Sequence, residues 1–282
     1  NRDSDYFLCS LLFSKKIVAV PDRDRMKKDR QENFIKFLGT AGARFVMLKQ
    51  LRASGGLWVS HKGTNVLIDP GPGSLVRCAS SRPKLDPAKL DAVILTHRHL
   101  DHANDINVMI EAMTEGGFKK RGILFCPEDA LNEDPVVLKH TRGLVGKIEI
   151  LEANKTYNVD NFEFQTSMRH IHPVLTFGLK FNLKNTSVSL LTDTKYFKEL
   201  TNFYKTDILI IYVVFFEPRP GVDHLCLLDV ESLLRDIQPK KAILTHFGMT
   251  MLRAKPQIQA LELSNKLGIE VSAAYDGMTI NF

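Results

Sequence analysis

The apolar positions of this chain fall into two patterns that alternate along most of its length. Short branched or alternating apolar runs are typical of strands, and apolar residues that recur every three or four positions are typical of helices. Strands are predicted over residues 34–38, 56–60, 65–68, 92–95, 122–126, 147–151, around 162–164, and over 177–182, 187–191, 207–216, 241–246, 270–274 and 278–281. Helices are predicted over 103–113, 230–237 and 256–267. This order of elements indicates an α/β protein.

One stretch, residues 91–104, carries the densest chemistry. An apolar strand ends at Thr96, and His97, His99, Asp101 and His102 follow within six positions. Side chains alternate along an extended segment, so His97 and His99 point the same way, while Asp101 and His102 lie where a helix begins. This geometry predicts two adjacent metal positions, against the alternative of a polar loop that happens to hold histidines. Imidazole and carboxylate ligands suit zinc first, with iron, manganese, cobalt and nickel as alternatives.

The run Thr-His-Arg-His-Leu-Asp-His at 96–102 resembles the T-H-x-H-x-D-H signature of the metallo-β-lactamase superfamily. The resemblance is closest to the tRNase Z and phosphodiesterase-like branch, and Gly39-Thr40 after the first strand is similar to the opening of that superfamily. It implies an αββα sandwich formed by a single domain over 34–282. A site of two divalent metal ions that activate a bridging hydroxide is implied as well.

The resemblance also assigns roles outside the central motif. It implies that Asp193, at the end of a buried strand, bridges the metals, with helix capping as the alternative role. His246 completes the second position with Asp101 and His102, since Ile-Leu-Thr-His at 243–246 repeats residues 94–97. His172, six residues before Gly178, matches the spacing of the third ligand to the first position, with His170 as the alternative.

Two further residues complete the expected catalytic set, which includes Asp101. In the resembling family an aspartate at the position of Asp69 orients a ligand histidine, although a turn-starting aspartate before Pro-Gly is an equally good interpretation. His224 matches the histidine general acid of the tRNase Z branch, but Leu225 and Cys226 stand where that branch often has a hydroxyl residue. A surface loop histidine is therefore the alternative for His224.

The charge of such a site favours an anionic substrate. Two divalent cations, less Asp101, Asp193 and a hydroxide, leave about one positive charge, which suits a singly charged phosphodiester. Arg44, Lys49 and Arg52 are expected in a loop that borders the site, either holding a phosphate or simply solvated. His61 and His140 are expected at the surface.

The sequence leaves several reactions open. Only a helix, a strand and a short loop are expected between Asp193 and His224, so there is no room for a tRNA exosite arm. A small nucleotide or an RNA end is thus favoured over a full tRNA. Hydrolysis of a thioester or lactone and a mononuclear iron dioxygenase remain alternatives, as does a metal-binding scaffold without turnover; His99 argues against a flavodiiron protein.

Composition adds limits to this picture. The chain has 282 residues, a net charge of +6 and four cysteines without C-x-x-C spacing, so neither a disulfide framework nor a cysteine metal site is predicted. Its pI near 9.0 favours anionic partners. The apolar run at 6–13 is shorter than a membrane span of about 20 residues, and basic residues follow it, unlike a signal peptide. Residues 1–33 are expected to be an extension of unknown role, no membrane association is predicted, the cytoplasm is the default location, and a homo-oligomer stays open.

Overall fold

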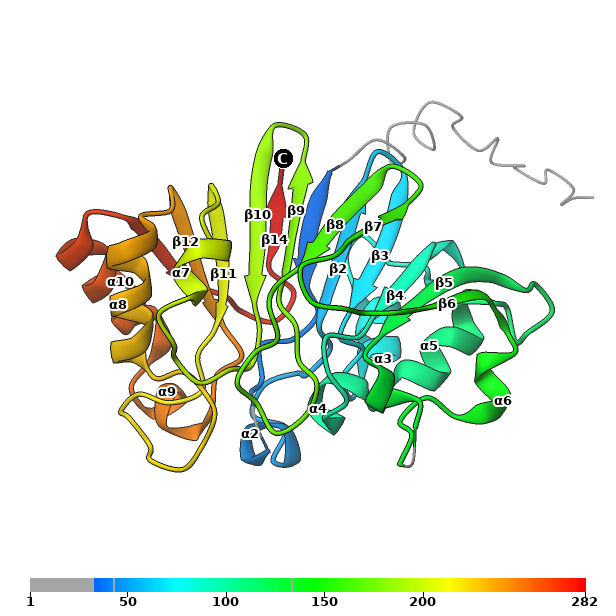
Figure 1. Ribbon diagram of the computed structural model, residues 1–282, viewed down its shortest axis with the longest axis horizontal. Coiled ribbons are helices and arrows are strands. Elements are labelled where there is room, and N and C mark those ends of the chain that lie inside the picture. The colour runs from blue at the N-terminus through cyan, green and yellow to red at the C-terminus, as the bar shows by residue number, and fades with distance from the viewer. Residues whose placement is uncertain (1–32, 43, 133) are drawn as a thin grey trace, which may run out of the picture.

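The computed structural model describes residues 33–282 except 43 and 133. Two seven-stranded sheets face each other at the centre, and helices cover the outer face of each, as Figure 1 shows. This is the predicted αββα sandwich in a single domain. The predicted extension at 1–33 lies outside the described residues except for Asn33. Within the described part of the chain, no helix is long and apolar enough to cross a membrane.

The first sheet has the strand order β14-β1-β2-β3-β4-β5-β6. Its strands are β1 Phe34–Phe37, β2 Leu57–His61, β3 Thr64–Ile68, β4 Ala92–Ile94, β5 Arg121–Cys126, β6 Val145–Ile150 and β14 Thr279–Asn281. The pairs from β14 to β3 are antiparallel, and those from β3 to β6 are parallel. The β2–β3 hairpin turns at Lys62 and Gly63, which both have positive φ, as the two-residue hairpin turn requires.

The second sheet has the order β13-β12-β11-β10-β9-β8-β7 and the same division. Its strands are β7 Thr156–Val159, β8 Phe162–Thr166, β9 Leu179–Leu183, β10 Thr186–Leu191, β11 Ile208–Tyr212, β12 Lys241–Thr245 and β13 Glu270–Ala273. From β13 to β10 the pairs are parallel, and from β10 to β7 they are antiparallel. Each sheet therefore changes from parallel to antiparallel pairing at one strand, β3 in the first and β10 in the second.

Helices flank both sheets, and short helical turns cluster at the ends of the parallel strands (Figure 1). The helices are α2 Phe45–Leu48, α3 Ser74–Ser80, α4 Leu100–Ala103, α5 Ile106–Met113, α6 Lys139–Arg142, α7 Leu200–Phe203, α8 Leu227–Ile237, α9 Met249–Arg253 and α10 Pro256–Leu267, with 3₁₀ turns at Pro87–Lys89 and Glu128–Ala130. The predicted helix over 103–113 is interrupted, so that α4 ends at Ala103 and α5 begins at Ile106. The predicted strand over 207–216 ends at Tyr212.

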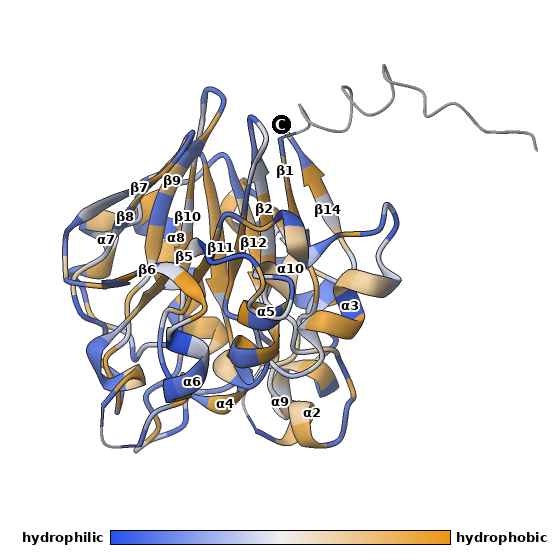
Figure 2. Ribbon diagram, turned by 90° about the vertical axis from the view of Figure 1, so that its right-hand side faces the viewer, coloured by the Kyte–Doolittle hydropathy of each residue, from blue (hydrophilic) through white to orange (hydrophobic). Residues whose placement is uncertain are grey.

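Three apolar clusters hold the four layers together. The central cluster fills the space between the sheets and includes Val59, Phe164 and Leu190. A second packs the outer face of the second sheet under α8 and α10, and a third packs the first sheet under α5. Figure 2 shows apolar positions along the strands between the helices. Such burial is the main favourable term in the stability of the sandwich.

Candidate metal centre

The candidate ligands lie at one end of the sandwich, where the parallel strands of both sheets terminate. Asp69 follows β3 and His97 lies three residues beyond the end of β4, in the first sheet. Asp193 follows β10 and His246 follows β12, in the second. Because the carboxyl ends of parallel strands meet at the same edge, residues far apart in the sequence converge there.

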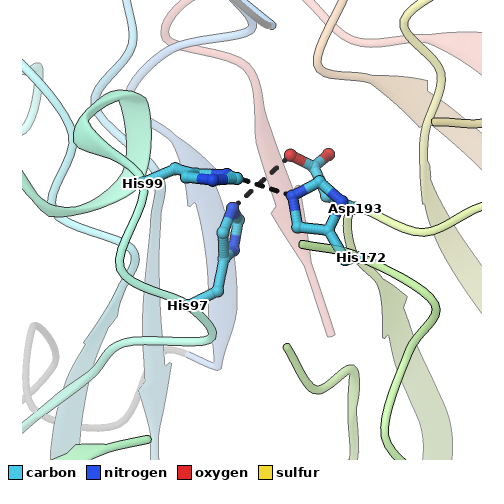
Figure 3. A group of neighbouring side chains, drawn as sticks. All are labelled: His97, His99, His172 and Asp193. Carbon is cyan, nitrogen blue, oxygen red and sulfur yellow. Dashed lines mark hydrogen bonds and ion pairs between the residues drawn. The ribbon is translucent and has the colours of Figure 1, made fainter. Parts of the chain in front are cut away.

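The first group consists of His97, His99, His172 and Asp193, shown in Figure 3. One ligand atom from each lies within 4.8 Å of all the others. His172 Nε2 is 3.0 Å from His99 Nδ1, and His97 Nε2 is 3.5 Å from Asp193 Oδ2. His97 and His99 point to the same place from the segment after β4, as alternation along an extended chain predicts.

The second group consists of Asp101, His102, Asp193 and His246, with ligand atoms within the same 4.8 Å. His246 Nε2 lies 3.0 Å from His102 Nε2 and 3.3 Å from Asp101 Oδ2. Asp193 belongs to both groups. The structure therefore brings all seven predicted ligands together, in the two sets that the sequence suggested.

Asp69 stands behind the second group and supports it. Its Oδ2 accepts hydrogen bonds from His102 Nδ1 at 3.0 Å and from Thr96 Oγ1 at 2.8 Å, and its Oδ1 accepts from Thr96 N at 2.7 Å. This arrangement leaves His102 Nε2 facing the group. The geometry supports the role in which Asp69 orients His102, over the alternative in which Asp69 only starts a turn.

The segment 167–178 is irregular and does not continue the strand before it, so His170 and His172 have different surroundings. His170 Nε2 is 2.6 Å from the Tyr204 hydroxyl and its Nδ1 is 3.1 Å from the Asp193 carbonyl, so both nitrogens have protein partners. His172 Nδ1 donates to the Asp223 carbonyl at 3.0 Å, which leaves Nε2 for the first group. His172, and not His170, lies in the group.

Gly178 explains how His170 acquires its partner. A Cβ at Gly178 would lie 1.8 Å from the Tyr204 hydroxyl, so only glycine allows this approach. Burial lowers the pKa of His170 to about 4 and thereby favours the neutral ring. The aromatic-glycine pair at 177–178 therefore fits a role in packing next to the site.

His224 lies against the shared carboxylate. Its Nδ1 is 3.5 Å from Asp193 Oδ1, and its ring makes an edge contact with that of His172. The side chain is only 12% exposed. The structure thus places His224 beside both groups and not on a solvated surface loop.

Three contributors escaped the sequence reasoning. The Tyr212 ring stacks on that of His246 with centroids 4.5 Å apart and an interplanar angle of 5°. Gly42 lets the chain pass close to His246, since a Cβ there would lie 2.1 Å from the His246 carbonyl oxygen. Thr96 supports Asp69, as described above. The only sequence signal for Tyr212 is an aromatic residue with a polar tip inside the apolar run at 207–216.

The expectation that His61 lies at the surface is wrong, because this residue is only 5% exposed. Strand β2 extends one residue beyond its predicted end, so His61 continues the alternation of Leu57 and Val59, which face the core between the sheets. Burial lowers its pKa. His140 is exposed, as predicted. The segment that holds Arg44, Lys49 and Arg52 forms the short helix α2 and is not only a loop.

The ligand atoms fit cations because several of them lack partners in the protein. His97 Nε2, Asp101 Oδ2, Asp193 Oδ1 and His246 Nδ1 are buried without a hydrogen-bond partner among the described residues. Unpaired buried polar atoms are costly and uncommon in native proteins. Divalent cations accept lone pairs from nitrogen and oxygen, so cations in the two groups would satisfy these atoms.

The protonation of four of these ligands points the same way. Burial lowers the pKa of His97 well below its usual value, and that of His99 to about 4, which leaves both as neutral ligands. Burial alone would raise the pKa of Asp101 and Asp193, but neighbouring imidazoles hold both well below the ordinary range. Neutral imidazole and ionised carboxylate are the forms that bind metal ions.

Comparison with known proteins settles the family. Residues 64–247 match the family described as the beta-lactamase superfamily domain, which is more than half of the chain. The chain belongs to the metallo-β-lactamase superfamily. In this superfamily the His/Asp cluster is a site for metal ions. The chain is also 30% identical over 256 residues to the uncharacterised protein MJ1374 of Methanocaldococcus jannaschii, covering 87% of this chain and 94% of that protein.

Solved structures of the superfamily share this fold. The metallo-β-lactamase fold protein YhfI from Bacillus subtilis has a TM-score of 0.72 at 18% identity, covering 89% of this chain and all of that one. A diphosphatase of the PhnP family has a TM-score of 0.66 at 20% identity, covering 89% and 98%. The short form of human tRNase Z has a TM-score of 0.63 at 16% identity, covering 88% and 98%. The family likeness shows a metallo-hydrolase of this superfamily.

Proposed function

We propose that this metallo-β-lactamase superfamily protein is a phosphodiesterase that binds two divalent cations, zinc first, in its two His/Asp groups. In this proposal His224 donates the proton that the leaving oxygen needs. The observation that carries it is the position of Asp193, which belongs to both groups and lies 3.5 Å from His224 Nδ1.

The first cation would be held by His97, His99 and His172, the second by Asp101, His102 and His246, with Asp193 common to both. When bound, such ions lower the pKa of water and stabilise negative charge on the oxygens of an ester undergoing displacement. Asp69 fixes the ring of His102, the usual task of an outer carboxylate. The two carboxylates offset only part of the cationic charge, so the site attracts an anion.

His224 has the surroundings of a proton donor. Burial works against its charged form, but the carboxylates of Asp193 and Asp101 together outweigh burial and raise its pKa above the usual value. Nδ1 faces Asp193, which leaves Nε2 without a protein partner among the described residues and available to a substrate. A positioned histidine of this kind is the commonest general acid in enzymes.

The chain segment between Asp193 and His224 is too short to hold an additional arm for a large substrate, which supports a small one. Only α7, β11 and the loop after it occupy this interval in the described structure. The solved relatives named above include a diphosphatase and a tRNase Z, which act on phosphorus esters or anhydrides by their names. We therefore favour a small nucleotide or an RNA end, the interpretation that the sequence also favoured, over a full tRNA.

The test is hydrolysis of bis(p-nitrophenyl) phosphate by protein reconstituted with Zn²⁺ or Mn²⁺. A chelator-treated sample and a p-nitrophenyl carboxylic ester serve as controls. The proposal expects metal-dependent release from the diester and little from the ester. Release from the ester alone, or from neither compound, would contradict it and direct attention to thioesters, lactones and iron-dependent oxygen chemistry.

His224→Ala separates the proton donor from the metal ligands. The expected outcome is retention of both cations with a loss of turnover, and His140→Ala, at an exposed histidine, is the matched control. Metal content measured on the same samples tells loss of the proton donor from loss of the site.

A further inference from the structure

A cavity lies on the outer face of the first sheet. It has a volume of about 320 Å³ and lies between α3 and the β1–β14 edge. Figure 2 shows α3, β1 and β14 on the same side of the molecule. None of its lining residues belongs to either His/Asp group. The cavity therefore needs an explanation of its own.

The charge of this cavity is strongly positive. Lys36, Arg77 and Arg82 line it, and none of the three has a carboxylate within ion-pair distance among the residues that the structure describes. The one carboxylate in the lining, Asp276, already accepts hydrogen bonds at both oxygens, from Thr40 Oγ1 at 2.7 Å and Ala53 N at 2.8 Å. The lining thus holds three cations and one carboxylate, and that carboxylate is bonded to other groups.

Lys36 is the most unusual of the three. Ile35 and Phe37 on either side point into the core between the sheets, so Lys36 points outward, yet only 6% of it is exposed. Its Nζ donates to Thr279 Oγ1 at 3.0 Å and to the Arg82 carbonyl at 3.4 Å. An ammonium group has three donors, and burying one without a counter-ion is costly. Burial accordingly lowers the pKa of Lys36.

The geometry points to a phosphate-binding site: we propose that Lys36, Arg77 and Arg82 hold a phosphate or diphosphate group in this cavity. Guanidinium groups bind phosphate oxygens through paired hydrogen bonds, and a lysine adds a point charge. The two arginines are exposed and the lysine is nearly buried, a gradient of exposure suited to drawing an anion inward. The volume is within the range of small-ligand pockets, about 300–1,000 Å³, so a diphosphate or part of a nucleotide fits as well as orthophosphate.

The test uses isothermal titration calorimetry on chelator-stripped protein, so that binding at the metal centre does not contribute. Inorganic phosphate, pyrophosphate and ADP are titrated separately at low ionic strength. Pyrophosphate is expected to bind. If ADP binds with the same affinity, the phosphate groups alone are recognised. If ADP binds more tightly than pyrophosphate, the nucleoside is recognised as well. Affinity should fall as salt is raised, because the contacts are ionic.

Arg77→Gln/Arg82→Gln removes two exposed cations without opening the core. It is expected to weaken pyrophosphate binding by about tenfold or more. Lys84→Gln/Lys89→Gln, at exposed positions outside the cavity, removes the same charge and should bind like the wild type. Equal losses in the two double variants, or no binding of any probe to the wild type, would overturn the proposal. Lys36→Met should likewise weaken pyrophosphate binding, and this variant is used only if circular dichroism shows that it keeps the native structure.

Discussion

The support that Asp69 gives to His102 can be tested with a single substitution. Asp69→Asn keeps the shape of the side chain but replaces one of its two acceptor oxygens with an amide donor. Asp69 has φ +55°, a left-handed conformation that asparagine and aspartate tolerate better than other residues, so the variant adds little backbone strain. Alanine would confuse loss of the hydrogen bond with that strain.

The size of the effect follows from the contacts. The carboxylate accepts from Thr96 N, Thr96 Oγ1 and His102 Nδ1 with both of its oxygens, and one amide oxygen cannot serve both sides. A hydrogen bond to a charged group contributes about 1.5–3 kcal/mol. Loss of an outer carboxylate usually weakens metal binding about 10–100-fold, which is about 1.4–2.8 kcal/mol. The two figures agree.

The assay is competition for Zn²⁺ between chelator-stripped protein and a fluorescent chelator, with metal content measured by mass spectrometry. Asp69→Asn is expected to weaken one of two binding steps, that of the group with His102. The matched control is Asp105→Asn, because Asp105 accepts from Leu75 N at 3.2 Å and touches no histidine. Wild-type affinity at both steps in a correctly folded Asp69→Asn protein would refute the orienting role.

Three further predictions follow from the same structure. His172→Ala should lower metal content while His170→Ala largely preserves it, as measured by mass spectrometry, and the reverse pattern would exchange their assignments. His224→Ala should keep the bound metal and cut diester turnover by about 10²-fold or more; an unchanged rate would remove His224 from the mechanism. Phe164→Ala, in the core between the sheets, should lower the free energy of unfolding by about 3–5 kcal/mol, as measured by urea titration. A loss below about 1 kcal/mol would show that this cluster contributes less to stability than its burial implies.

Local patterns were enough to predict an α/β protein and two metal positions at the central motif, whereas the αββα sandwich and the roles of Asp193, His172 and His246 followed from the resemblance to the superfamily. His97, His99, Asp101 and His102 lie within six positions, so strand alternation and the following turn determine how they point. Strands β3, β4, β11 and β12 were found because their apolar runs are buried on both faces, and β8 because its apolar residues alternate. What local pattern could not supply was the pairing order of the sheets and the break between α4 and α5, since tertiary contacts decide these.

The choice between His170 and His172 shows where sequence reasoning stops. Two histidines with one residue between them would share a face in a strand, but the segment 167–178 is irregular. The partners that separate them, Tyr204 and the Asp223 carbonyl, lie 34 and 51 residues away along the chain. The burial of His61 was missed for a simpler reason, because the strand was ended one residue too early.

The two sheets place equivalent carboxylates on opposite sides of one histidine. Asp69 follows β3 and Asp193 follows β10, and these are the strands at which each sheet changes from parallel to antiparallel pairing. Asp69 binds His102 at Nδ1 from behind, while Asp193 Oδ2 lies 3.4 Å from Nε2 in front. Burial alone would keep His102 neutral. The carboxylates of Asp69, Asp193 and the nearby Asp101 instead raise its pKa well above the usual value. The fold thus concentrates negative charge around a buried imidazole ring. A proton on that ring balances the charge when no metal is bound, and a cation at Nε2 would take the place of the proton.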